Sequence, residues 1–147
     1  MNELVSTAGK WVVLNKTDEA VGEFVTRVLK LTDIPRVVTD RRHDKRTAYP
    51  HLLTLTPLDD DVLQVVGEPV TVVGKHIAQR GLDFFHVVPL SFKRAIVSFE
   101  ESLHLDNHFV LKIGWCRFLR PGWYDSGGRF THIITPKSGG DVPRHLP

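Results

Sequence analysis

The sequence feature that most limits the fold of this chain is a series of short segments rich in strand-forming residues. Each segment is bounded by proline, glycine or charged residues, and the segments cover 51–55, 69–77, 82–88, 95–99, 109–119 and 130–134. Val, Thr and aromatic residues favour strands, and turn signals at regular intervals between short strands are typical of β-barrels. The series therefore predicts a small antiparallel β-barrel of five or six strands.

One amphipathic helix is predicted ahead of these strands, at roughly 17–32. Thr17 and Asp18 offer an N-cap, and Pro35 prevents the helix from continuing. The apolar residues between them are spaced so that they share one helical face: Val21, Phe24, Val25, Val28 and Leu29. We expect this face to cover the open end of the β domain. The apolar run 11–14 is a candidate strand or a segment that packs against later elements of the chain.

Length and composition indicate one soluble domain without an internal disulfide. The chain has 147 residues, 41% of them hydrophobic and 24% charged, and Cys116 is its single cysteine. The formal net charge of +2 is too small for nucleic-acid binding driven by charge alone. No stretch approaches the roughly 18 apolar residues of a membrane span, and the segment Met1–Leu4 lacks signal-peptide features. We therefore expect a cytoplasmic protein that does not insert into membranes.

The order of these segments divides the chain into three parts. Residues 1–36 form a helical extension, and 37–135 form the β-barrel domain, with 34–46 as the linker into it. Residues 136–147 combine glycine, proline and charged residues and can bury little apolar surface, so we predict a flexible tail.

A short basic stretch, Arg41-Arg42-His43-Asp44-Lys45-Arg46, stands immediately before the first barrel strand. It places four permanent cations within six residues. Arginine presents a planar fork of donors that can hold a phosphate, meet a guanine edge or stack on a ring. In a turning loop Arg42 and Arg46 can converge on one ligand, so the stretch predicts a site for an anionic, guanine-bearing molecule. A solvated basic loop is the plainer interpretation of the same residues.

Other candidate catalytic or metal-binding residues are better explained by structure. Asp125-Ser126-Gly127-Gly128 is similar to the nucleophile segment of trypsin-like proteases, but the chain is too short for their two-barrel scaffold, and a glycine-rich hairpin turn explains it better. His104 and His108 lack the further ligands of a zinc site and are expected on the surface. Cys116 is expected to be a packed thiol.

Three aromatic residues near the end of the longest predicted strand could stack on nucleobases. At strand spacing, aromatic side chains more often belong to a core or a girdle, and that is the role we expect for them. The three residues are Trp115, Trp123 and Tyr124.

An R-x-x-x-R pair directly before a small β-barrel resembles the PilZ domain, the bacterial receptor module for cyclic di-GMP. The family's second motif, [D/N]-x-S-x-x-G, is matched in position by the segment His76-Ile77-Ala78-Gln79-Arg80-Gly81. The pair Gly114-Trp115 and the glycine-bearing final hairpin are also similar to the family's last strands. The resemblance covers roughly residues 40–135.

The second motif departs from the family at two positions. His76 stands where the family has Asp or Asn, and Ala78 stands where it has Ser. A neutral imidazole offers one acceptor, and alanine offers no polar side-chain group. Losing one polar contact whose partner stays buried costs on the order of 1–3 kcal/mol. The departures leave Gly81, whose missing Cβ lets a planar ligand approach the backbone.

The resemblance implies a mainly β fold, namely a six-stranded PilZ-like barrel with an N-terminal helix. It also implies a non-catalytic bacterial signalling or adaptor protein that binds cyclic di-GMP as a second messenger, without cofactor or metal, and passes the signal to a protein partner. The implied ligand-binding residues are Arg42, Arg46, His76 and Gly81, with Arg41 and Arg80 adding positive charge. The alternative is a degenerate PilZ-like protein-interaction module that does not bind the nucleotide. A general nucleic-acid-binding barrel is a weaker third interpretation.

Overall fold

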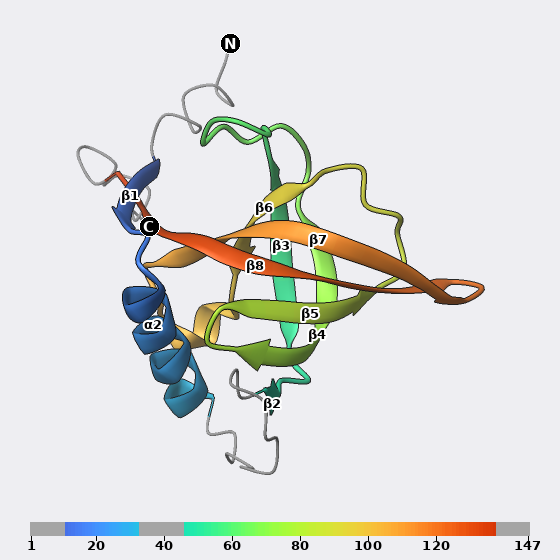
Figure 1. The fold of residues 1–147 in the computed structure, drawn as a ribbon, viewed down its shortest axis with the longest axis horizontal. Helices are drawn as coiled ribbons and strands as arrows, with labels where there is room; N and C mark the ends of the chain where they lie inside the picture. Colours follow the sequence, from blue (N-terminus) through green and yellow to red (C-terminus); the bar gives the residue numbers. More distant parts are fainter. Residues whose placement is uncertain (1–10, 33–45, 138–147) are drawn as a thin grey trace.

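The computed structural model describes residues 11–32 and 46–137. Most of these residues lie in strands, and one helix packs beside them (Figure 1). The elements in chain order are β1 (Trp11–Asn15), α2 (Asp18–Leu31), β2 (Thr47–Ala48), β3 (Leu52–Leu58), β4 (Val70–Ala78), β5 (Gly81–His86), β6 (Arg94–Ser98), the 3-10 turn η1 (Glu101–Leu103), β7 (His108–Arg120) and β8 (Trp123–Pro136).

Six of the strands close into an antiparallel barrel. Around the barrel, neighbouring strands pair in the order β3, β4, β5, β8, β7 and β6, and β6 pairs again with β3. β1 extends the sheet beside β8, and β2 pairs with β4. The predicted mainly β fold with a six-stranded antiparallel barrel is therefore confirmed, and the apolar run 11–14 belongs to strand β1.

Helix α2 begins and ends within one residue of the predicted range. Thr17 is its N-cap, and the Thr17 hydroxyl accepts a hydrogen bond of 3.2 Å from the Ala20 amide. The apolar face is buried and belongs to the same core as the barrel interior. Phe24 packs against two aromatic rings of the core, with its ring centre 4.6 Å from that of Phe109 and 6.2 Å from that of Phe99. The helix therefore contributes directly to the barrel core.

A stack of aromatic rings lies at the centre of that core. Phe109 and Phe130, on the paired strands β7 and β8, stack face to face with ring centres 3.8 Å apart. Phe99 approaches Phe109 edge-on at 5.9 Å. Offset and edge-to-face ring pairs stabilise a core beyond the area that they bury. These rings join the strands to the apolar face of α2.

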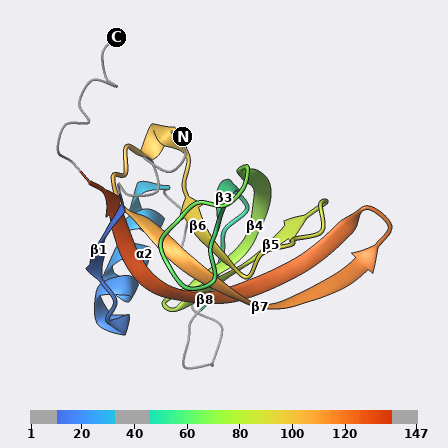
Figure 2. The ribbon, with the colours of Figure 1, turned by 90° about the horizontal axis from the view of Figure 1, so that it is seen from above.

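The outer parts of β7 and β8 form a ribbon that projects beyond β6 on the side away from α2 (Figures 1 and 2), and β5 stays paired with β8 along this ribbon as far as Tyr124. The pairing of β6 with β7 ends at Lys112, whereas β7 and β8 stay paired to Arg120 and Trp123. The chain reverses at Pro121-Gly122, where Gly122 has a φ of 89°, a conformation that favours glycine. Cys116 lies exposed on this ribbon, so the expectation of a packed thiol was wrong.

The predicted turn at 126–128 was also wrong, because these residues lie inside β8. Ser126 is fully buried, and its hydroxyl lies 2.7 Å from Nε2 of His86. His86 Nδ1 lies 2.8 Å from the Val88 carbonyl, which can only accept, so Nδ1 carries the proton and Nε2 accepts from Ser126. The buried pair links β5 to β8. A nucleophile at Ser126 would have no access to a substrate.

His108 is not the surface residue that the sequence predicted. Its ring packs edge-on against Trp11 at 5.3 Å, and burial lowers its pKa below the usual 6.5. His104, by contrast, is exposed and takes the left-handed conformation with a φ of 53°.

We expect the lowered pKa of His108 to make the fold less stable in mild acid. The unfolded chain binds a proton at His108 more readily than the folded chain, so stability falls as the pH drops below about 6.5 towards the lower folded pKa. Burial lowers the pKa of His132 too, so that group acts in the same direction. Chemical denaturation at about pH 7.5 and about pH 5.5 should show a smaller acid-induced loss for His108→Gln than for the unchanged protein. An equal reduction in exposed His104→Gln would contradict this assignment.

Within residues 11–32 and 46–137, no helix is both long and apolar enough to cross a membrane. Residues 138–147 of the predicted tail (136–147) and residues 34–45 of the predicted linker (34–46) lie outside the described residues.

Candidate functional site

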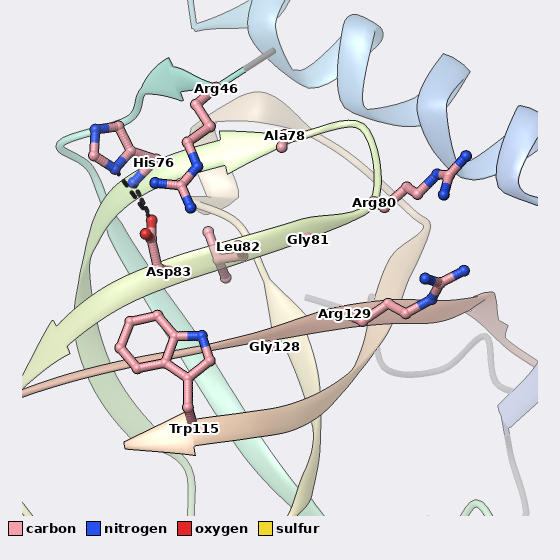
Figure 3. A pocket seen from close by; sticks show the side chains of 10 residues that line it. All are labelled: Arg46, His76, Ala78, Arg80, Gly81, Leu82, Asp83, Trp115, Gly128 and Arg129. Carbon is pink, nitrogen blue, oxygen red and sulfur yellow. Dashed lines mark hydrogen bonds and ion pairs between the residues drawn. The ribbon is translucent and has the colours of Figure 1, made fainter. Parts of the chain in front are cut away.

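A pocket of about 260 Å³ lies on the outer wall of the barrel, where β4, β5, β7 and β8 run side by side (Figure 3). Along β5, Leu82 and Phe84 are buried in the core, so Asp83 between them faces the opposite side of the sheet. The pocket is lined by Arg46, His76, Ala78, Arg80, Gly81, Leu82, Asp83, Trp115, Gly128 and Arg129.

The floor of the pocket is made of residues with little or no side chain. Ala78 and Gly81 face each other across the β4–β5 pair, and Gly128 lies on the next strand. A Cβ at Gly81 would collide with the Gly128 carbonyl oxygen, so only glycine fits there without a backbone shift. Such a floor allows a flat ligand to lie close to the backbone.

One end of the pocket combines a cation, a carboxylate and an indole (Figure 3). The Arg46 side chain extends over β4 from the residue before β2, towards the side where His76 and Asp83 lie. His76 and Asp83 are paired across β4 and β5, and the Asp83 carboxylate accepts a hydrogen bond of 2.8 Å from the His76 amide. The Asp83 side chain is only 9% exposed. Trp115 completes this end of the pocket from β7.

The His76 ring contacts the same carboxylate without a hydrogen bond. Nδ1 of His76 lies 3.4 Å from Oδ1 of Asp83, and Nδ1 is buried without a hydrogen-bond partner among the described residues. The backbone amide of His76, rather than its imidazole, therefore fixes the position of Asp83.

The Trp115 indole lies flat against the backbone of β8. A Cβ at Gly127 would come within 2.5 Å of the indole, so Gly127 makes room for Trp115. The guanidinium of Arg117 lies over the indole at 5.3 Å from the ring centre. Arg117 and Lys75 both bind Oδ2 of the buried Asp125, at 3.1 and 3.0 Å. This ion-pair cluster holds Trp115 at the edge of the pocket.

Two further arginines form the other end of the pocket and point towards α2 (Figure 3). Arg80 lies in the β4–β5 turn, with Nε 3.6 Å from Asp18, and Arg129 on β8 approaches Asp18 at 3.4 Å. Asp18 is the first residue of α2. These ion pairs are largely exposed, so each adds little stability, and an anion in the pocket would compete with Asp18 for the two guanidinium groups.

The structure brings together four of the six predicted ligand-binding residues. Arg46, His76, Arg80 and Gly81 line one pocket, whereas Arg41 and Arg42 lie outside the described residues.

Three polar or aromatic residues of the pocket were not among the predicted ligand-binding residues: Asp83, Trp115 and Arg129. A signal for Asp83 was present, because a two-residue turn at 79–80 pairs 78 with 81 and 76 with 83. Trp115 does not belong to the core, since it lies 41% exposed beside the pocket.

Within the described part of the chain, no group of three or more His, Cys, Asp or Glu side chains is arranged to hold a metal ion. The chain was compared with protein-family models, with curated proteins and with solved structures, and none of the three comparisons found a match.

Proposed function

We propose that this chain is a PilZ-like bacterial signalling or adaptor protein that binds cyclic di-GMP in the outer-wall pocket and catalyses no reaction. In this proposal it acts in the cytoplasm and passes the signal to a protein partner. The observation that supports it most is that Arg46 of the first motif and His76, Arg80 and Gly81 of the second motif line the same pocket, although the two motifs are separate in the sequence.

The charges of the pocket suit a ligand with two phosphates and two guanines. Three arginines line it, against a single carboxylate. Arginine forks hold phosphate oxygens, and their flat faces stack on rings. A base can stack on the Trp115 indole by displacing the Arg117 guanidinium that lies over it, a side chain that is 63% exposed, and stacking on an aromatic side chain contributes about 1–3 kcal/mol per base. The glycine and alanine floor leaves room for the base plane.

The alternative function is a PilZ-like protein-interaction module without a nucleotide. Two observations favour it. Ala78 offers no hydroxyl to a ligand, and Arg80 and Arg129 are already paired with Asp18. A ligand would have to compete with that carboxylate for the two guanidinium groups.

Calorimetric titration with cyclic di-GMP separates the two functions. We expect the unchanged protein to bind, and Arg46→Ala to bind about 10- to 100-fold more weakly, the cost of about 1–3 kcal/mol for one lost arginine contact. Arg42→Ala tests the first arginine of the motif in the same way. Arg27→Ala, which removes an exposed arginine of α2 outside the pocket, is the control and should bind normally.

Absence of binding heat at high ligand concentration would favour the interaction module instead. Affinity for any single-stranded nucleic acid, falling steeply with added salt, would point to the nucleic-acid-binding interpretation.

A further inference from the structure

We propose that Asp83 is the residue that selects guanine in this pocket, an inference that rests on the proposed function. Asp83 lies on β5, two residues after the end of the second motif, at the position directly opposite His76 on β4. The neighbouring strand would thus supply the carboxylate that the motif itself lacks.

The backbone fixes the Asp83 carboxylate in one orientation. Oδ1 accepts the 2.8 Å hydrogen bond from the His76 amide and also lies closest to the His76 ring. Among the described residues, every contact found for this carboxylate involves Oδ1. Oδ2 is therefore the oxygen that a ligand in the pocket can reach. A nearly buried carboxylate with one oxygen held and one oxygen open is a pre-organised acceptor.

Trp115 fixes the plane of a base relative to this acceptor. Gly127 on β8 pairs with Asp83 on one side and with Trp115 on the other, so the indole and the carboxylate face the same small area of the outer wall. A base stacked on the indole would point an edge, rather than its face, at Asp83. The recognition is therefore by hydrogen bonding at the base edge, with stacking as support.

The chemistry of a carboxylate distinguishes guanine from adenine. An ionised carboxylate only accepts hydrogen bonds. The Watson–Crick edge of guanine presents two adjacent donors, N1–H and N2–H, to such an acceptor. The edge of adenine presents N6–H beside the unprotonated N1, whose lone pair would face the carboxylate. Each good edge contact discriminates against the wrong base by on the order of 10- to 100-fold.

The test titrates three cyclic dinucleotides into the unchanged protein: cyclic di-GMP, cyclic di-IMP and cyclic di-AMP. The inosine ligand keeps N1–H and lacks the N2 amino group. We expect the tightest binding for the guanine ligand, intermediate binding for the inosine ligand, and binding at least about tenfold weaker for the adenine ligand. This arm needs no mutant, so equal binding of the guanine and adenine ligands would overturn the inference even where a variant folds poorly.

Asp83→Asn replaces the open acceptor Oδ2 with an amino group, which donates hydrogen bonds. The asparagine oxygen can still accept from the His76 amide, while its amino group faces the pocket as a donor. We expect cyclic di-GMP to bind about 10- to 100-fold more weakly to this variant, while cyclic di-AMP binds as tightly as before or more tightly. Asp60→Asn, an exposed position outside the pocket, is the matched control and should change neither affinity.

The outcomes separate this inference from the function on which it rests. If the unchanged protein binds cyclic di-GMP and cyclic di-AMP equally, or Asp83→Asn keeps the unchanged ratio of the two affinities, Asp83 does not select the base and the proposed function stands. If the unchanged protein binds none of the three ligands, the proposed function fails and the inference fails with it.

Discussion

Replacing Phe109 by alanine is expected to lower the free energy of unfolding by about 3–5 kcal/mol, the usual cost of removing a buried aromatic ring. The ring is 0% exposed and touches three others, with centres 3.8 Å from Phe130, 4.6 Å from Phe24 and 5.9 Å from Phe99. Those neighbours come from β8, from α2 and from the segment after β6, so the cavity would loosen the helix and the barrel together. Denaturant unfolding followed by circular dichroism measures the loss.

Phe118→Ala is the matched control, because it removes the same ring from the same strand. Phe118 is 61% exposed on the projecting ribbon, and we expect a change within about 0.5 kcal/mol. A similar loss in both variants would mean that β7 is stabilised along its whole length rather than at the ring stack.

Adding one methyl group at Gly128 is expected to destabilise the barrel by about 1–3 kcal/mol, as overpacking does at a tightly filled site. A Cβ at this position would collide with the Lys112 carbonyl oxygen and would lie 2.8 Å from the Ile113 Cα. Both obstacles are backbone atoms of the paired strand, so relief requires β7 and β8 to move apart. Because Gly128 also lines the pocket, the proposed binding of cyclic di-GMP should weaken in the same variant.

Gly114→Ala provides the comparison for this prediction, since no heavy atom lies within 4 Å of a Cβ built at Gly114. We expect a change within about 0.5 kcal/mol for that substitution. Thermal melts of the two variants compare them directly. Equal melting temperatures for Gly128→Ala and Gly114→Ala would show that β8 can shift without loss of stability. The close contact of Gly128 with β7 would then not be required for the fold.

The sequence predicted the barrel and its helix because both leave local signals. Proline, glycine and charged residues mark the ends of nearly every strand, and the apolar spacing from Val21 to Leu29 is regular. Packing against distant residues did not overturn these local preferences. The strand and helix positions therefore needed no knowledge of long-range contacts.

The errors in β7 and β8 arise where the strands are irregular. Strict alternation places Ile113 and Trp115 on one face, but Ile113 pairs with Gly128 and Trp115 pairs with Gly127. The extra residue, Gly114, is a bulge that reverses the alternation and turns Trp115 to the outer wall. Glycines 127 and 128 were interpreted as a turn, since glycine marks turns and close backbone contacts alike.

From the sequence, site residues could be predicted only within the two motifs. The two arginine-bearing segments supplied Arg46 and Arg80, yet nothing local connects Trp115 or Arg129 to them. Those two residues reach the pocket through the pairing of β7 and β8 with each other and of β8 with β5, which depends on closure of the whole barrel. Asp83 needed one further step of inference, namely the register of a two-residue hairpin.

Because the pocket lies on the outside of the barrel wall, its lining can change, by design or in evolution, largely independently of the core. Side chains that fill the interior and side chains that line the pocket alternate along the same strands, so the two sets are almost separate. Polar substitutions at Arg46, Arg80 or Arg129 can change what the molecule recognises while the interior stays intact. A barrel built in this way can acquire or lose a ligand at little risk to its fold.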